Sequence, residues 1–137
     1  MGDGEKTERI ETCTMSPAEN CVMIGLTINK RHLRGMMDSG AKRSVIDIGT
    51  LETLHKDIRI EPKDDIRLYD ASDNKMNILG CCSLTLRIPK VNKTVTQEFT
   101  VLNVKTYKTL LLGRDFFKKM GPVTIDVGHN RTKLCGT

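Results

Sequence analysis

The feature that most constrains this fold is an alternation of apolar and polar residues in several short segments. In the clearest one, every second residue is apolar: Val22, Ile24, Leu26 and Ile28. Successive side chains of a β-strand point to opposite faces, so this period of two predicts a strand with one buried face. The same pattern recurs at 84–88, where Pro89 ends it, and at 123–127. The sequence therefore predicts a mostly-β domain of many short strands.

Other apolar stretches and two short helical patterns complete the expected elements. Further strands are predicted at 33–37, at 66–69, at 99–104 and from Met76 onward. The continuous apolar run 110–112 predicts a short strand that is buried on both faces. Thr50 is expected to cap a short helix that carries Leu51 and Leu54 on one face. A second brief helix is expected at 115–120.

Length and local composition predict one domain with a disordered start. At 137 residues the chain is long enough for one substantial core but not for two. Residues 1–20 lack hydrophobic periodicity, and we expect a flexible leader there. The folded domain is expected to span 21–128, with a C-terminal tail at 129–137. No apolar run approaches the ~20 residues of a membrane-spanning helix, so no membrane partner is expected.

Charge and cysteine content argue against nucleic-acid and metal sites. The net charge is +5, but the basic residues are scattered, which favours a solvated surface over direct nucleic-acid binding. The five cysteines are odd in number and include no CxxC pair, and the three histidines lack the spacing of zinc ligands. We therefore expect reduced structural thiols, no metal and no cofactor.

One tripeptide, Asp38-Ser39-Gly40, is a candidate for chemistry. Taken alone it is equally consistent with a turn, because Asp, Ser and Gly are all turn formers. It follows the apolar pair Met36-Met37, however, and a carboxylate beside apolar strands needs hydrogen bonds or a shared proton to offset its desolvation. Ser39 offers a hydroxyl for such a bond, and Gly40 lets the backbone approach the carboxylate closely.

Three segments occur in a fixed order along the chain. They are Met36-Met37-Asp38-Ser39-Gly40-Ala41, a hairpin with its tip at 70–74 followed by Ile78-Leu79-Gly80, and Leu110-Leu111-Leu112-Gly113-Arg114-Asp115-Phe116-Phe117. In type, order and spacing these segments resemble the motifs of the retropepsin family, the aspartic proteases of retroviruses and long-terminal-repeat retrotransposons. The resemblance covers roughly residues 21–128.

The resemblance implies a mostly-β, small closed β-barrel-like aspartic protease fold with one or two short helices, which acts as a homodimer. It implies that Asp38, Ser39 and Gly40 form the catalytic motif. The hairpin stands in the place of the family's flap, the cover that closes over the substrate. The substrate-contacting residues of flap and cleft are then Ala41, Ala71, Ser72, Asp73 and Ile78.

The resemblance also assigns a structural role to the last of the three segments. Gly113, Arg114 and Asp115 are expected to support the active-site loop, with the Arg114 guanidinium bonded to backbone or carboxylate beneath it. Many viral members carry an acidic residue after Gly-Ala that takes part in a salt-bridge network with this arginine, and here that position is Lys42. Asp115 is most simply explained as an N-terminal helix residue.

A single aspartate motif requires a second copy of the chain. Aspartic proteases activate water between two carboxylates that share one proton. The other Asp-x-Gly segments, 47–49 and 126–128, lack the hydroxyl residue after the acid. Two-fold symmetry supplies the second Asp38. The implied substrate is a polypeptide, of the Gag/Pol polyprotein type, in the cytoplasm or in virus-like particles.

Two other functions remain open at the level of sequence. The domain would be a catalytically silent dimerisation or peptide-binding module of a larger host protein if the motif no longer cleaves. A small basic β-barrel that binds RNA is the second alternative. It would require exposed aromatic residues for base stacking, and the chain has only three Phe and two Tyr, mostly at apolar positions.

Overall fold

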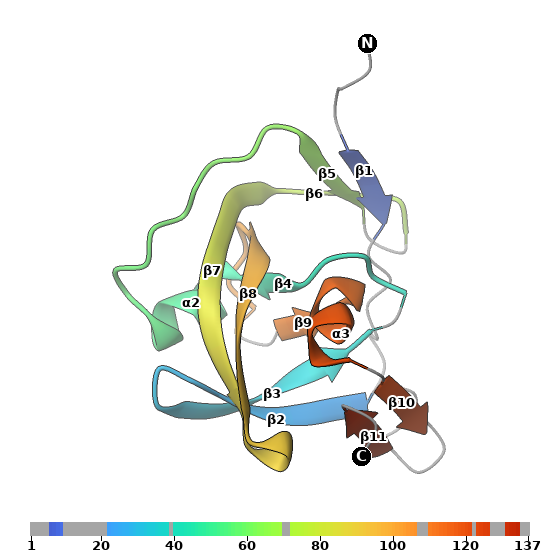
Figure 1. Cartoon of the computed structure of the whole chain (residues 1–137). Coiled ribbons are helices and arrows are strands. Elements are labelled where there is room, and N and C mark those ends of the chain that lie inside the picture. The colour runs from blue at the N-terminus through green and yellow to red at the C-terminus, as the bar shows by residue number, and fades with distance from the viewer. Residues whose placement is uncertain are drawn as a thin grey trace.

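The protein was analysed as a computed structural model, which describes residues 6–9, 22–38, 40–69, 72–106, 110–121, 123–126 and 131–134. Within this part, six strands close into a barrel in the order β2-β3-β9-β4-β8-β7 (Figure 1). Their bounds are β2 Val22–Ile28, β3 Arg31–Met37, β4 Val45–Asp47, β7 Ile78–Ile88, β8 Lys93–Leu102 and β9 Leu110–Leu112. The expected mostly-β fold with a small closed barrel is confirmed.

Two small sheets and short helices accompany the barrel in the described residues. The first sheet has the order β1-β5-β6, and the second pairs β10 with β11. Their bounds are β1 Lys6–Arg9, β5 Ile66–Tyr69, β6 Lys75–Met76, β10 Val123–Asp126 and β11 Arg131–Leu134. The helices are α2 Ile48–Leu54, α3 Arg114–Met120 and a 3-10 turn at Pro89–Val91. The segments expected to be leader and tail thus each contain a paired strand.

The longest pairing in the barrel is the β7–β8 hairpin, and here the expected boundaries were wrong. The strand expected at 99–104 begins at Lys93 and ends at Leu102, directly after the 3-10 turn. Asn92 closes that turn with a positive φ of 51°, a conformation that Asn adopts more readily than most residues. The tight turn therefore lets β8 pair with β7 from Ile88↔Lys93 onward.

The cap of helix α2 is also corrected. Asp47, rather than Thr50, is the N-cap, and its carboxylate accepts hydrogen bonds from the backbone N–H and the hydroxyl of Thr50. The helix starts three residues earlier than a Thr50 cap implies, and its buried face includes Leu51 and Leu54 as expected. A buried carboxylate needs such bonds to offset its desolvation, and Asp47 is fully buried.

Strand β9 occupies a central place between two parts of the barrel. It pairs in parallel with β3, where Met37 lies opposite Leu112, and antiparallel with β4, where Val45 lies opposite Leu111. Its three leucines are all buried, as the apolar run predicts. The ends of β3 and β9 are thereby brought together, and the segments that follow both strands lie next to each other.

The buried side chains form two clusters. The larger one fills the barrel and includes Leu26, Leu86, Phe99, Leu112 and Phe116. The smaller one, which we call the flap cluster, lies between β5 and the barrel. It consists of Ala41, Val45, Ile66, Leu68, Cys81, Leu102 and Leu111, with Met76 and Ile78 packed against it.

Candidate active site

Asp38 follows strand β3 directly, at a point where the backbone is held by β9. Its backbone N–H donates to the carbonyl oxygen of Leu112 at 2.9 Å and so extends the β3–β9 pairing by one residue. The side chain is half-buried, and its Oδ2 atom is buried. The carboxylate is therefore fixed to a central strand of the barrel.

The residues after Asp38 form a tight turn around its carboxylate. The backbone N–H of Gly40 donates to Oδ1 of Asp38 at 2.9 Å, and the N–H of Ala41 donates to the Asp38 carbonyl at 3.2 Å. A Cβ on residue 40 would lie 3.2 Å from Oδ1, closer than most such contacts, which explains why glycine suits this position. Ser39 lies outside the described residues. The segment is therefore a turn and also holds the carboxylate, so the two interpretations of the sequence do not exclude each other.

The segment at Gly113 packs against the backbone of this turn. The backbone N–H of Arg114 donates to the Ala41 carbonyl at 2.8 Å. A Cβ on residue 113 would lie 2.7 Å from the Arg43 carbonyl oxygen and 2.8 Å from that of Ala41. Because both neighbours are backbone atoms, only glycine allows the two segments to approach this closely. Two motifs that lie far apart in the sequence therefore interlock through their backbones.

The carboxylate of Asp115 ties the loop to two further residues. Its Oδ1 accepts from the Ser44 hydroxyl at 2.8 Å, and its Oδ2 accepts from the Ser44 N–H at 3.2 Å and from Nε2 of Gln97 at 2.8 Å. The Ser44 hydroxyl also accepts from the N–H of Gly113 at 3.1 Å. Ser44 and Gln97 are both buried. Asp115 is thus the centre of a polar network, beyond the simple helix-start role expected from the sequence.

Sequence reasoning did not single out Ser44 or Gln97. Ser44 precedes an apolar strand, as many turn residues do, and Gln97 lies on β8, 18 residues before Asp115. One signal could have identified Gln97: it is a polar residue at a position of β8 that faces inward, and buried polar groups need hydrogen-bond partners.

Arg114 does not make the expected side-chain contact within the described part of the chain. Its side chain is exposed, and no hydrogen bond or ion pair of its guanidinium is seen with the described residues. Among the described residues, the contact between Arg114 and the loop is the bond from its backbone N–H to Ala41.

Solved structures with a similar arrangement were found. The retroviral protease-like domain of Ddi1 from Leishmania major matches with a TM-score of 0.60 and 20% identity, covering 85% of this chain and 88% of that one. EIAV protease in complex with the inhibitor HBY-793 matches with a TM-score of 0.63 and 17% identity, covering 82% of this chain and all of that one. A retropepsin-like aspartic protease from Rickettsia conorii matches with a TM-score of 0.53 and 16% identity, covering 77% of this chain and 76% of that one. No protein-family model and no curated protein matches the sequence.

The chain has the retropepsin fold. At these identities the likeness establishes the fold alone. Asp38 lies at the end of β3, and the Gly113 segment lies directly against its turn.

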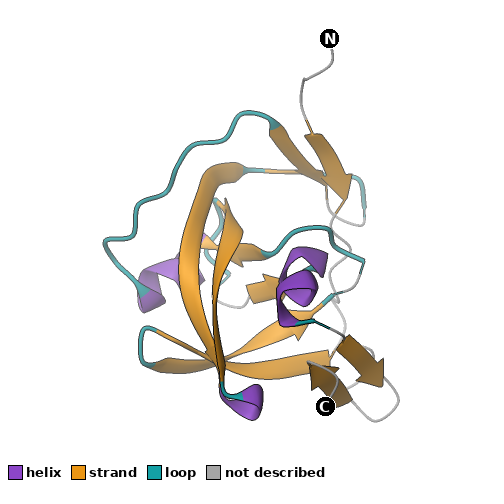
Figure 2. Cartoon of the chain, viewed as in Figure 1, coloured by secondary structure: helices purple, strands orange, loops and turns teal. Residues whose placement is uncertain are grey.

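The hairpin of β5 and β6 stands where the resemblance in sequence implies a flap, and we call it the flap. Its inner face presents Ile66 and Leu68 to the flap cluster, whose other members include Ala41 and Leu111 beside the Asp38 turn. Figure 2 shows the long connection that leads from α2 around the molecule to β5. The flap strand therefore rests on the same residues that flank the candidate catalytic loop.

The expected substrate-contacting residues lie at different depths. Ser72 and Asp73 are exposed at the tip, and Asp73 has a positive φ of 68°. Ile78 is half-buried, and Ala41 is fully buried in the flap cluster. Ala71 lies outside the described residues. Contact of these residues with a substrate stays a prediction.

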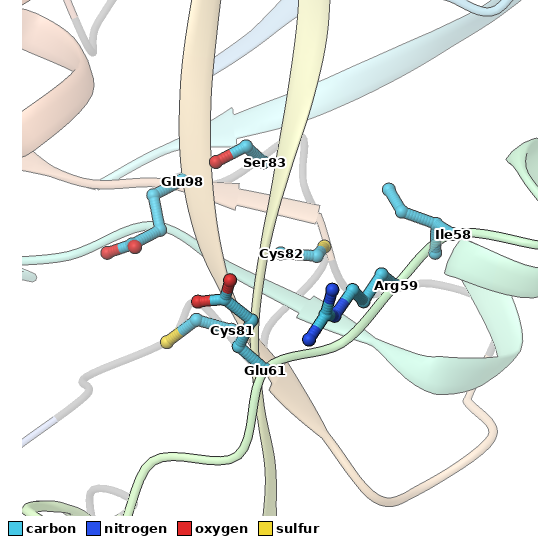
Figure 3. Close-up of a pocket in the computed structure, with 7 residues that line it drawn as sticks. All are labelled: Ile58, Arg59, Glu61, Cys81, Cys82, Ser83 and Glu98. Carbon is cyan, nitrogen blue, oxygen red and sulfur yellow. The ribbon is translucent and has the colours of Figure 1, made fainter.

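The adjacent thiols of Cys81 and Cys82 line a pocket of about 290 Å³ between β7, β8 and the connection before β5. Figure 3 shows their sulfur atoms pointing away from each other, with Arg59, Glu61 and Glu98 around the pocket. Burial raises the pKa of both thiols, that of Cys82 to about 11. Because the thiolate is the reactive form, these are structural thiols.

Two other kinds of site were also sought in the described segments. They contain no group of three or more His, Cys, Asp or Glu residues that could hold a metal ion. None of their helices is long and apolar enough to cross a membrane.

Proposed function

We propose that this protein is an aspartic endopeptidase that works as a homodimer and cleaves peptide bonds with water activated between two Asp38 carboxylates. The observation that carries the proposal is the cradle of Asp38. Its backbone is held by Leu112, its carboxylate accepts from Gly40, and its turn is locked by Arg114 through the backbone. The likeness to proteases of the retropepsin fold supports the same activity.

The requirement for a dimer follows from the other carboxylates near this loop. Asp47 is fully buried and caps helix α2, and Asp115 is engaged by Ser44 and Gln97. Both acids therefore have structural roles, and neither is proposed as the second catalytic carboxylate. A second Asp38 from a symmetric copy supplies the missing partner.

The two carboxylates would divide the chemistry between them. Two such groups at roughly 3 Å repel too strongly for both to ionise, so the pair shares one proton. The ionised Asp38 takes a proton from the water, and the protonated Asp38 of the other subunit donates to the scissile carbonyl oxygen. The pair titrates as a unit, and we expect an activity optimum on the acid side of neutral pH. Activity that still rises above pH 8 would contradict a shared proton.

The proposed substrate is an extended segment of a polypeptide, of the Gag/Pol polyprotein type encoded by a retrovirus-like element. The exposed tip at Ser72 and Asp73 and the half-buried Ile78 are the proposed contacts, with the flap closing over the peptide. Main-chain hydrogen bonds to the flap hold such a peptide whatever its side chains. The apolar flap cluster beneath favours hydrophobic residues next to the cut.

The proposal is tested by digestion of an unfolded protein, such as reduced and alkylated casein, with fragments identified by mass spectrometry. Asp38→Asn should lower the rate at least about a thousandfold, since it removes the general base and the shared proton. The matched control is Asp57→Asn, which removes the same charge from an exposed turn and should cleave normally. Equal cleavage by wild type and Asp38→Asn would overturn the proposal.

The dimer is tested by the same assay at falling protein concentration. The rate per mole of chain should drop once the concentration falls below the dissociation constant of the dimer. A rate per mole that stays constant down to the concentration at which sedimentation shows only monomer would contradict a site shared by two subunits. Peptide binding without cleavage under all conditions would favour the silent module instead.

A further inference from the structure

Strand β1 is the third strand of the flap sheet. It pairs in parallel with β5 along its whole length, from Lys6↔Ile66 to Arg9↔Tyr69. The opposite edge of β5 pairs with β6. Figure 1 shows β1, at the blue end of the chain, lying beside the green flap strands. A segment that precedes the barrel by more than ten residues thus covers one edge of the flap.

The covered edge belongs to a strand that packs close to the Asp38 turn. β5 has four residues, whereas β6 has two. Ile66 and Leu68 anchor β5 on the flap cluster, which contains Ala41, three residues after Asp38, and Leu111. A peptide added to the outer edge of β5 would therefore pair with a strand that packs against the neighbours of the candidate catalytic loop.

An edge strand offers a row of backbone donors and acceptors that bind an extended chain of almost any sequence. β1 satisfies this row from within the same molecule. Tethered segments act at effective concentrations on the order of millimolar, so even weak pairing keeps such an edge occupied. A free substrate has to displace the tethered strand before it can pair there.

We propose that the outer edge of β5 is a peptide-binding edge of the flap and that β1 is its built-in occupant, which competes with substrate. This inference rests on the proposed protease function. The N-terminal strand raises the KM for a peptide substrate without changing kcat, because it blocks binding and leaves the Asp38 chemistry intact. Unpairing or removal of β1 is then the step that opens the flap edge.

The test compares two variants of the full chain. Thr7→Pro combined with Glu8→Pro removes two consecutive backbone N–H groups of β1, one of which must face β5, and so disrupts the pairing. The matched control, Thr7→Ala combined with Glu8→Ala, keeps both N–H groups. Amide hydrogen exchange of residues 66–69 should become about tenfold faster in the proline variant and stay as in wild type in the alanine variant.

The second readout is cleavage of a fluorogenic peptide built from the best-cut casein site. The proline variant should show a KM about tenfold lower than the alanine variant at equal kcat. A synthetic peptide of residues 5–10, added in excess, should restore the high KM of the proline variant as a competitive inhibitor.

The outcomes separate the inference from the function on which it rests. Unchanged exchange at 66–69 together with normal cleavage and unchanged KM would overturn the role of β1 and leave the protease intact. Faster exchange with no cleavage by any variant, wild type included, would overturn the proposed function and the competition with it. Faster exchange with unchanged KM would show that substrate does not use this edge and would also overturn the inference.

Discussion

The candidate catalytic loop, which follows Asp38, and the flap lie against each other, yet they are held by different kinds of interaction. The loop is fixed by directional bonds: backbone bonds from Asp38 and Arg114, and the carboxylate of Asp115 bonded to Ser44 and Gln97. The flap strand β5 pairs with β6 over two residue pairs and with β1 over four, but its contact with the barrel is made by apolar side chains.

This difference suits two tasks that the proposed protease has to combine. Several short hydrogen bonds in a buried network define one position for a carboxylate, because each bond lost there leaves a desolvated polar group. Apolar contacts have little directional preference, so a strand that rests on them can lift and return without breaking the barrel. We therefore expect the loop to keep its carboxylate in one position and the flap to open and close above it.

The largest expected effect contrasts two fully buried leucines, one from each region. Leu112→Ala should lower the free energy of unfolding by ~4 kcal/mol, because it leaves a cavity in the barrel core. Leu68→Ala should cost only about 2 kcal/mol, because the flap can separate locally from its cluster. Urea denaturation measures both values. Equal losses would mean that the flap is as much a part of the cooperative core as β9.

The next effect concerns the polar network under the loop. Asp115→Ala should cost ~3 kcal/mol, since the buried Ser44 and Gln97 both lose a charged acceptor. The neighbouring substitution Arg114→Ala is the control and should change stability by less than about 0.5 kcal/mol, because its side chain is exposed. Thermal unfolding and casein cleavage are measured for both. A loss at Arg114 as large as that at Asp115 would show that the guanidinium has a partner in the dimer.

Much of the barrel could be predicted because its signals are local. Strands β2, β5 and β9 lie where alternation or an unbroken apolar run places them. The errors occurred where two local signals competed. Asp47 and Thr50 are both good helix caps, and only burial of the Asp47 carboxylate in the folded chain decides between them.

The candidate site could be predicted only in part. Gly113 and Arg114 were recognised by their motif, although the decisive feature of Gly113 is the nearby Arg43 carbonyl, which no sequence pattern reveals. Ser44 and Gln97 were missed because their partner Asp115 lies 71 and 18 residues away along the chain. The pairing of β1 with β5 is equally remote in sequence, and the segment 6–9, in which three of the four residues are charged, carries no strand periodicity.

A smaller effect is expected at the base of the flap. Gly80 has a φ of 149° and lies at an irregularity of β7, where a Cβ would lie 2.2 Å from the Glu61 carbonyl oxygen. Gly80→Ala should cost about 2 kcal/mol and weaken the bridge between Glu61 and Cys81. Gly25→Ala, at a strand position with open space, should stay within about 0.5 kcal/mol. Exchange at the Cys81 amide, which donates to Glu61, reports the bridge. An unchanged exchange rate would show that the base of the flap adapts freely.

The smallest expected effect on stability at neutral pH comes from two neighbouring thiols, one in the flap cluster and one in the barrel core. Cys81 lies in the flap cluster, and Cys82 lies in the barrel core. Burial raises the pKa of both, that of Cys82 to about 11, so the contribution of Cys82 to stability is complete below about pH 9 and is lost as the pH rises toward 11. At pH 8 a thiol with a pKa near 11, as in Cys82, is about a hundredfold less ionised than one near 9, so its alkylation should be slow while it stays buried.

Opening of the flap alone should expose Cys81, which packs in the flap cluster, whereas exposure of Cys82 should require the barrel itself to open. Cys81 should therefore react with iodoacetamide at least about tenfold faster than Cys82, measured by peptide mapping in Cys82→Ala and Cys81→Ala chains. Proline substitution in β1 should accelerate Cys81 and leave Cys82 unchanged, because it loosens only the flap sheet. Equal rates for the two thiols would mean that flap and barrel open together, and the contrast between a fixed loop and a mobile cover would then fail.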